Sequence, residues 1–205
     1  MTVEFFSSAE LPAAPWKNGG GTTQEIACRP LGADLASFDW RISIAQIASS
    51  GPFSAFAGMD RTIVLLQGDG VQLRSADGSI DHALSRPLAP FAFAGDVALD
   101  CRLLGGASRD FNVMVRRGVL RAQVRVADGA AGRACAPQGL LLAVRGAWRI
   151  GGLAQDASTL VAGARDGVYW TGLGAAAVAA TPLAPDAQLL LVELHEAVTT
   201  ARGAA

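Results

Sequence analysis

Short apolar runs, each closed by glycine, proline or aspartate, recur along the whole chain and limit what it can fold into. The run Thr62–Leu66 ends shortly before Gly68–Gly70, and another run begins at Val71. Runs of this length between turn residues are typical of strands, and the glycine-rich break indicates a tight hairpin. Helix signals are few. We therefore predict an all-β fold, built as a sandwich or barrel.

The segment Trp40–Ala45 alternates large apolar residues with Arg41 and Ser43. This two-residue period indicates a strand with two unlike faces. Either the Trp40 face packs in the core and Arg41 is exposed, or the reverse holds, and the sequence leaves both open. Further strands are predicted at 61–67, 71–74, 91–93, 98–104, 111–116 and 120–126.

The second half of the chain repeats the order of elements found in the first. Segment 140–150 echoes 62–72, segment 158–168 echoes 91–97, and segment 188–195 echoes 112–116. We therefore predict two β-barrel repeats rather than two unrelated domains. The first barrel, residues 1–117, carries the candidate site, and the second, residues 118–205, packs with it as one unit.

The balance of charged and apolar residues excludes several kinds of partner. Hydrophobic residues make up 51% of the chain and charged residues 17%, which favours a large core over disorder. The net charge is −1 and the longest basic cluster is Arg116-Arg117, so the chain lacks the basic surface of a nucleic-acid binder. No apolar run reaches the roughly 18 residues of a membrane span, and residues 1–11 lack the basic start of a signal peptide.

The cysteines and histidines do not form a metal site or a disulfide framework. Cys28, Cys101 and Cys135 are odd in number and widely spaced, so we expect small buried side chains in a reducing cytoplasm. The only histidines, His82 and His195, lie in different repeats, so no two- or three-histidine iron or zinc site can be assembled. We predict neither a metal nor another cofactor.

The segment Trp16–Glu25 contains the only lysine of the chain, Lys17, followed by glycines at 19–21. Glycines can serve a structural loop that needs positive φ, or can let backbone N–H groups approach an anion. The first interpretation does not explain Lys17, nor Glu25, the only glutamate between Glu10 and Glu193. The segment is not a phosphate loop, because its lysine precedes the glycines.

Two further segments mix polar and apolar residues. In the strand that begins at Phe111, Asn112 and Met114 share a face with Asp110, which points either to solvent or into a barrel mouth. At the start of another strand, Asp60-Arg61 forms a structural ion pair or presents the arginine fork to a ligand carboxylate. Both pairs of alternatives stay open.

No motif of a common hydrolase is present: the chain has no Gly-x-Ser-x-Gly elbow and no histidine near a cysteine. An enzyme of another kind remains an alternative. It would be a metal-free isomerase or hydrolase of a small carboxylate metabolite, with Lys17 and Glu25 as acid and base.

The combined motifs resemble the HutD/Ves family. The resemblance rests on Pro15–Ile26, Phe38–Ser43, Gly51–Arg61 with Phe53, Ser54 and Phe56, and Asp110–Met114. Their order and spacing are similar to the family from about residue 16 to 117, and the second half is less distinctive. The resemblance implies a bicupin, meaning two cupin-like barrels of the RmlC-like jelly-roll type in one bacterial cytoplasmic chain.

The resemblance also implies a function. Family members are associated with histidine utilisation or described as stress-induced. They are thought to bind a small anionic intermediate, such as a formylated or formimino glutamate, and to moderate the pathway. No enzymatic activity is established for the family. The missing metal histidines agree with this chain, in which Phe53, Ser54 and Phe56 bind no metal.

Our leading hypothesis is therefore a metal-free bicupin that binds a small anionic metabolite in its N-terminal barrel. Lys17 and Arg61 would attract the anion, and Glu25 would hold Lys17 or contact an amine. The proposed ligand-binding residues are Trp16, Lys17, Asn18, Gly20, Thr22, Glu25, Arg41, Phe53, Arg61, Asn112 and Met114. The second barrel forms homodimer contacts or acts as a scaffold. A regulator that binds a histidine-pathway protein is a third hypothesis.

Overall fold

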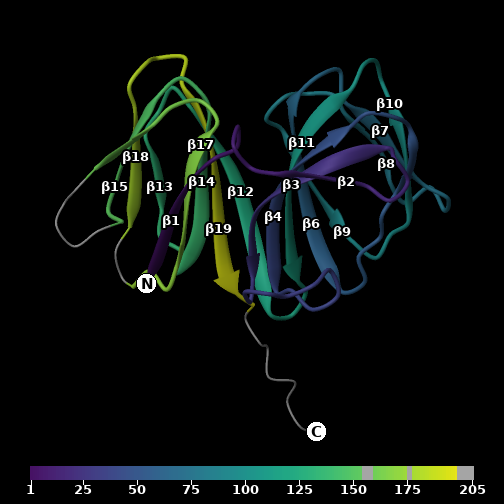
Figure 1. Ribbon diagram of the computed structural model, residues 1–205, viewed down its shortest axis with the longest axis horizontal. Helices are drawn as coiled ribbons and strands as arrows, with labels where there is room; N and C mark the ends of the chain where they lie inside the picture. Colours follow the sequence, from purple (N-terminus) through teal and green to yellow (C-terminus); the bar gives the residue numbers. More distant parts are fainter. Residues whose placement is uncertain (154–158, 175–176, 198–205) are drawn as a thin grey trace, which may run out of the picture.

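The computed structural model describes residues 1–153, 159–174 and 177–197. Within these ranges the chain forms strands and no helix, so the all-β prediction is confirmed. Figure 1 shows two halves side by side, the first mainly in blue and teal and the second mainly in green and yellow. The strands predicted from residue 61 to residue 126 are all present, some with shifted ends.

The first half consists of two sheets. The larger has the strand order β2-β3-β4-β11-β6-β9, and the smaller has the order β5-β10-β7-β8. The bounds are β2 Ala13–Pro15, β3 Gly21–Arg29, β4 Trp40–Ile47, β5 Gly51–Phe53, β6 Met59–Gln67, β7 Val71–Ser75, β8 Asp81–Leu84, β9 Pro90–Ala94, β10 Leu99–Leu103 and β11 Ser108–Arg116.

The second half also consists of two sheets. The larger has the order β1-β17-β14-β19-β12, and the smaller has the order β13-β18-β15-β16. The bounds are β1 Thr2–Ser7, β12 Leu120–Asp128, β13 Gly132–Ala134, β14 Gln138–Arg145, β15 Trp148–Gly151, β16 Leu160–Ala162, β17 Asp166–Thr171, β18 Val178–Pro182 and β19 Gln188–Glu196.

The two halves repeat one topology. The order β4-β11-β6-β9 matches β12-β19-β14-β17, and β5-β10-β7-β8 matches β13-β18-β15-β16. The first and last sequence echoes agree with this match, because they pair β14 and β15 with β6 and β7, and β19 with β11. The middle echo is displaced: segment 158–168 begins outside the described residues and contains β16, whereas β17 occupies the place equivalent to β9.

Three large apolar cores hold the molecule together. One lies between the sheets of the first half, one between the sheets of the second half, and one between the two large sheets where the halves meet. Trp40, Phe111 and Val113 belong to the core between the halves. The central strands of each large sheet are therefore buried on both faces, and the residues that alternate with Trp40 and Phe111 point into the N-terminal barrel.

Strand β1 connects the first residues of the chain to the second half. It pairs along its whole length with β17, from Thr2 opposite Thr171 to Ser7 opposite Asp166. Figure 1 shows the purple strand within the green half. The predicted division after residue 117 falls in the turn between β11 and β12, but it assigned β1 to the first barrel. Local sequence patterns do not identify a strand partner that is so far away along the chain.

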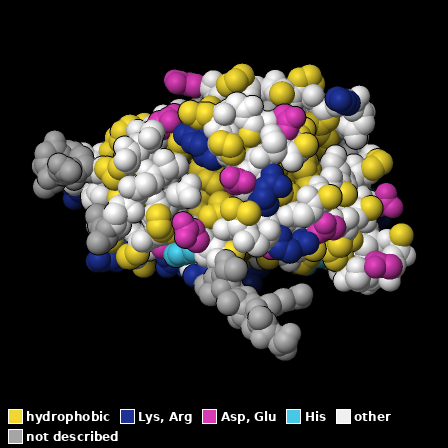
Figure 2. Space-filling view, turned by 90° about the horizontal axis from the view of Figure 1, so that it is seen from below, with side chains coloured by type: hydrophobic (Ala, Val, Ile, Leu, Met, Phe, Trp, Pro, Cys, Tyr) yellow, Lys and Arg dark blue, Asp and Glu magenta, His cyan; other side chains and the backbone are white. Residues whose placement is uncertain are grey.

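The outer surface mixes charges of both signs. Figure 2 shows one face on which blue and magenta side chains are interspersed among apolar and uncharged ones. No helix in the described ranges is long and apolar enough to cross a membrane.

Candidate functional site

The interior of the N-terminal barrel holds a group of buried polar side chains. They come from neighbouring central strands, because Asn112 of β11 lies opposite Ser43 of β4, and Met114 lies opposite Arg61 of β6. Arg61 is 4% exposed and Asp110 is 2% exposed. Burial of polar groups is costly unless each finds a partner. The hydrogen-bond partners of these groups therefore decide whether their burial is compensated within the protein.

Arg61 is a fixed cation inside the barrel. Its Nη1 donates to the carbonyl oxygen of Ser54 at 2.9 Å, and Nη2 lies 3.4 Å from Oδ1 of Asn112. Its guanidinium carbon is 4.6 Å from the ring centre of Phe53, and the rings of Phe56 and Phe93 lie 5.2 Å away. Burial lowers the pKa of Arg61 to about 10, opposed by Asp110, so the side chain remains charged at neutral pH.

Asp110 faces the same interior without a partner. Neither of its carboxyl oxygens has a hydrogen bond in the described chain, and the same is true of the Ser43 hydroxyl and of Arg61 Nε. Burial raises the pKa of Asp110 to about 7, although the charge of Arg61 opposes the shift. Buried polar groups in folded proteins are nearly always paired. Buried polar atoms of Ser43, Arg61 and Asp110 therefore remain without a partner among the described residues of this barrel.

A pocket of about 130 Å³ opens next to this interior. It is lined by Trp16, Asn18, Gly20, Ile47, Ser49, Ser50, Gly51, Pro52, Phe53 and Cys101. One of its wall residues contacts the buried polar group, and a second feels its charge. Phe53 stacks on Arg61, and the pKa of Cys101 is raised to about 11, first by burial and then by the charge of Asp110. The unpaired groups therefore lie behind the pocket wall.

The glycine-rich loop shapes one side of the pocket. Trp16 Nε1 donates to Thr23 Oγ1 at 2.8 Å, and Gly20 N donates to Asn18 Oδ1 at 3.0 Å. Gly19 has φ of 71°, which favours glycine, whereas Gly21 is needed for space because an added Cβ would lie 2.2 Å from the carbonyl oxygen of Gln46. The glycines thus have a structural role and also place Trp16 and Asn18 at the pocket.

Lys17 and Glu25 are not brought together. Lys17 is exposed and forms no hydrogen bond or ion pair with the described residues, although it lies between two residues that line the pocket. Glu25 Oε2 accepts from Arg41 Nε at 2.7 Å. Arg41 is 13% exposed and its charge contributes to the lowered pKa of Arg61. Glu25 therefore holds Arg41 rather than Lys17, and no geometry supports an acid–base pair of Lys17 and Glu25.

Two other candidate residues lie away from the pocket. Thr22 points from β3 in the direction opposite to Thr23 and lines a separate cleft between the halves. Met114 is 1% exposed and packs against Phe38 and Met59 in a small apolar cluster. Thr22 is separated from the pocket by the alternation of strand faces. Met114 shares the barrel face of β11 with Asn112, but it lies further along the strand, among apolar side chains.

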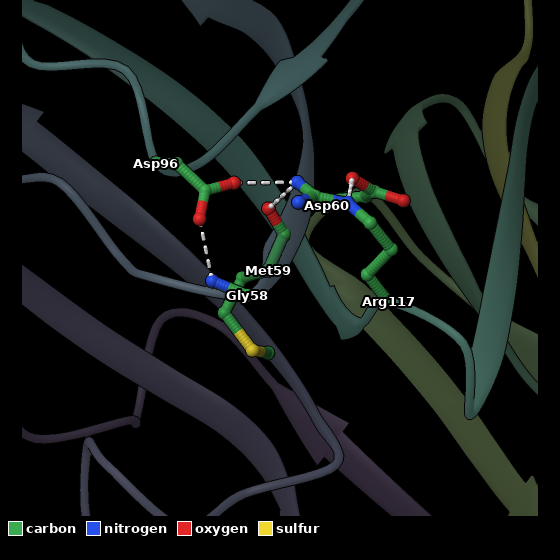
Figure 3. Close-up of polar contacts among 5 residues, drawn as sticks. All are labelled: Gly58, Met59, Asp60, Asp96 and Arg117. Carbon is green, nitrogen blue, oxygen red and sulfur yellow. Dashed lines mark hydrogen bonds and ion pairs between the residues drawn. The ribbon is translucent and has the colours of Figure 1, made fainter.

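Asp60 and Arg61 do not form an ion pair with each other. Figure 3 shows Asp60 beside Arg117, whose Nε lies 2.8 Å from Asp60 Oδ1 and whose Nη2 lies 2.6 Å from Asp96 Oδ2. Asp96 also accepts from Gly58 N at 2.7 Å. These contacts fix the start of β6 at the surface. Asp60 therefore holds the strand in place, while Arg61, the next residue, points into the barrel.

The donor set does not fit a metal ion. Within the described residues no three His, Cys, Asp or Glu side chains gather in a possible metal cluster. His82 stacks on Phe91 with ring centres 3.7 Å apart. Phe53 and Phe56, which have no metal-binding atom, surround Arg61 instead. The fixed positive charge in this barrel belongs to a guanidinium group of the chain.

The principal residue missed by sequence reasoning is Asp110. Its place on the face of Asn112 was visible from the strand alternation, and that was the one signal that could have identified it. The missing partners of its carboxyl group are a property of the fold. Cys101, Ser49 and Ser50 were also missed, because they come from segments without a distinctive motif.

The HutD family model matches residues 8–188. An uncharacterised 21.2 kDa protein of the hutC 3′ region in Pseudomonas putida is 46% identical over 130 residues, covering 62% of this chain and 65% of that protein. The protein Ves of Escherichia fergusonii is 39% identical over 150 residues, covering 73% of this chain and 76% of Ves.

Solved structures agree with these matches. The structure of HutD from Pseudomonas fluorescens SBW25, described as a formate condition, has a TM-score of 0.79 and 34% identity, covering 96% of this chain and all of that one. The oxalate decarboxylase of Lactobacillus farciminis in its formate complex has a TM-score of 0.65 at 10% identity, covering 92% and 85% of the two chains. This second likeness shows the fold alone, and it confirms the predicted cupin-type barrels.

Proposed function

This chain belongs to the HutD family, which is linked to histidine utilisation, and on that premise we propose that it binds a small anionic metabolite in its N-terminal barrel. The observation that carries the proposal is the group of unpaired polar atoms on Arg61, Asp110 and Ser43. A buried carboxyl without a partner destabilises the free protein. A ligand that supplies the missing partners would remove that cost.

The chemistry of the group restricts the ligand. Arg61 Nε is a free donor beside the Phe53 wall of the pocket and suits a carboxylate oxygen. Asp110 as a carboxylate is an acceptor and suits an N–H group. A metabolite with a carboxylate and a nearby N–H, such as a formylated or formimino glutamate, satisfies both. The small pocket of about 130 Å³ also favours a ligand of few atoms.

The proposed role is to moderate histidine utilisation in the cytoplasm by responding to such an intermediate. Lys17, exposed beside Trp16 and Asn18, would attract the anion before it enters. Among the residues that the structure describes, Lys17 and Glu25 do not form an acid–base pair, and we therefore propose binding rather than catalysis.

Thermal unfolding of the purified protein tests the proposal. Formylglutamate, formiminoglutamate, glutamate, urocanate and formate are compared at equal ionic strength. A ligand at 100 times its dissociation constant adds about 2.7 kcal/mol to the free energy of unfolding. We expect a selective increase with the formylated or formimino compound.

Two variants locate the effect. The double variant Arg61→Met with Asp110→Asn removes both buried charges at similar volume and should abolish the increase. Arg74→Gln, which removes an exposed arginine of β7, serves as the matched control and should leave it unchanged. A ligand that stabilises the double variant as much as the original protein would refute a site at Arg61.

A further inference from the structure

A second cleft lies where the two halves of the molecule meet. Its volume is about 250 Å³, and its lining includes Thr22, Gln24, Gln46 and Arg109 from the first half and Arg165 from the second. Ile44, which belongs to the core between the halves, also lines it. The cleft is separate from the pocket at Phe53, because Arg109 and Asp110 are neighbours on β11 that point to opposite faces of the sheet.

Two arginines converge in this cleft without an acidic partner. No carboxylate in the described chain forms an ion pair with Arg109 or with Arg165. Burial lowers the pKa of Arg109, and the nearby charge of Arg165 lowers it further. Two guanidinium groups that repel each other leave a local excess of positive charge in a protein whose net charge is −1.

The first arginine is held in place by a chain of hydrogen bonds. Arg109 Nη2 donates to Gln24 Oε1 at 3.1 Å. The amide nitrogen of Gln24 donates in turn to the carbonyl oxygens of Ser8 at 3.2 Å and Leu11 at 2.7 Å. The amide of Gln24 is therefore fixed in one orientation, with its oxygen toward Arg109. Because this contact uses Nη2, the other guanidinium nitrogens of Arg109 are available to a ligand.

The second arginine is held by an unusual backbone. Arg165 has φ of 77°, in a region where side chains other than glycine cost on the order of 1 kcal/mol or more. Its N–H donates to the carbonyl oxygen of Ala143 at 2.7 Å, and its own carbonyl accepts from Ser8 N at 2.8 Å. Glycine would fit this backbone without strain. The Nη2 of Arg165 donates to the carbonyl oxygen of Ser8 at 3.5 Å, the same oxygen that accepts from Gln24, which places the side chain beside the hydrogen bonds of Arg109.

We propose that this cleft is a second binding site, which takes a small oxyanion with two negative charges between Arg109 and Arg165. Two guanidinium forks match the oxygens of a phosphate or of a dicarboxylate. Thr22 and Gln46 add uncharged hydrogen-bonding groups at the rim. A bound anion would neutralise the repulsion and connect the two halves. The site does not depend on the carboxylate pocket in the N-terminal barrel.

An NMR titration of ¹⁵N-labelled protein tests this site with inorganic phosphate and, separately, with succinate, both at constant ionic strength. We expect saturable shifts at the backbone amides of Arg109 and Arg165. Binding of phosphate alone or succinate alone identifies the natural class of anion. The absence of a saturable shift with either compound would overturn the proposal.

Variants make the result specific. Arg165→Gly relieves the backbone strain, so this variant should fold at least as well as the original protein. Arg165→Gly and Arg109→Gln should each weaken the binding of the anion about tenfold. Arg121→Gln on the exposed face of β12 makes the same charge change elsewhere and should have no effect. Equal weakening in all three would show non-specific attraction and refute the site. The double variant Arg61→Met with Asp110→Asn should retain the shifts.

Discussion

The guanidinium carbon of Arg61 lies 4.6 Å from the ring centre of Phe53, and Phe53 also lines the pocket of about 130 Å³. A cation against an aromatic face is stabilised by the quadrupole of the ring, more so when water is excluded. Phe53 therefore holds the charge in place and also connects it to the ligand space. The neighbouring Asp110 carboxyl has no hydrogen bond within the described residues, and the charge of Arg61 opposes the rise in its pKa.

Loss of Arg61 alone should be more harmful than loss of both charges. Arg61→Met removes the positive charge that opposes the raised pKa of Asp110, and leaving a buried carboxylate without that charge should cost at most about 3–5 kcal/mol. Arg61→Met with Asp110→Asn should lose less stability than the single variant at neutral pH. Urea unfolding of both variants measures the difference. A double variant that is less stable than Arg61→Met would contradict a functional coupling of the two charges.

Asp110 should make the protein less stable as the pH rises. Its pKa is about 7 in the folded state, above that of an aspartate in an unfolded chain at about 3.9. Between these values the folded state binds the extra proton, so the free energy of unfolding falls as pH increases across this window. Unfolding midpoints from about pH 5 to pH 8 measure the slope. In Asp110→Asn this component of the slope should be absent. An unchanged slope would show that Asp110 does not cause the loss of stability with rising pH.

Asp110 should also determine selectivity between ligands. Glutarate carries two carboxylates and no nitrogen, so it cannot donate to Asp110, whereas formylglutamate can. Calorimetric titration should show that Asp110→Asn reduces the preference for formylglutamate over glutarate by about tenfold, since a hydrogen bond to a charged carboxylate becomes a weaker one to a neutral amide oxygen. Arg74→Gln serves as the control. A preference that is the same in Asp110→Asn and in the original protein would place the N–H group of the ligand elsewhere.

Lys17 should influence how fast the ligand arrives. Its side chain is exposed beside the pocket, and exposed charges act mainly on association rates and their salt dependence. Stopped-flow binding should show slower association for Lys17→Ala at low salt, with little change in the dissociation rate. The difference should shrink as salt is added. A large increase in the dissociation rate would instead indicate direct contact between Lys17 and the ligand.

Gly21 should tolerate no side chain. A Cβ at this position would lie 2.2 Å from the carbonyl oxygen of Gln46, which belongs to the backbone of the neighbouring strand. Gly21→Ala should therefore reduce the free energy of unfolding by about 3 kcal/mol. Gly51→Ala is the matched control, because a Cβ there meets nothing within 4 Å. Thermal unfolding compares the two variants, and equal midpoints would show that β3 can move away.

The fold was largely predictable because alternation and turn residues are local signals. The alternation at Trp40 and Arg41 was interpreted correctly as two unlike faces. Both alternatives predicted that one face would be exposed, and neither face is. Trp40 packs between the halves, and Arg41, only 13% exposed, points into the barrel. A sheet that is covered on both sides cannot be recognised from one strand alone.

The site was predictable only in part, for a similar reason. Trp16, Asn18, Gly20 and Phe53 do meet at one pocket, since each lies in a short segment with an unusual composition. Asp110 was not selected, because its importance comes from the hydrogen bonds that it lacks, which depend on every strand around it. The arginine at position 165 has no sequence motif, and only the backbone conformation draws attention to it.

Strand β1 has a consequence for the order in which the molecule can be assembled on the ribosome. It is synthesised before any other described strand, yet its hydrogen-bonding partner β17 ends at Thr171. The N-terminal barrel, β2 to β11, can emerge and close while β1 is still unpaired. The last sheet is completed only when most of the chain has been translated. Strand β1 thus leaves the ribosome before β2 to β16 but can pair only after β17 has followed.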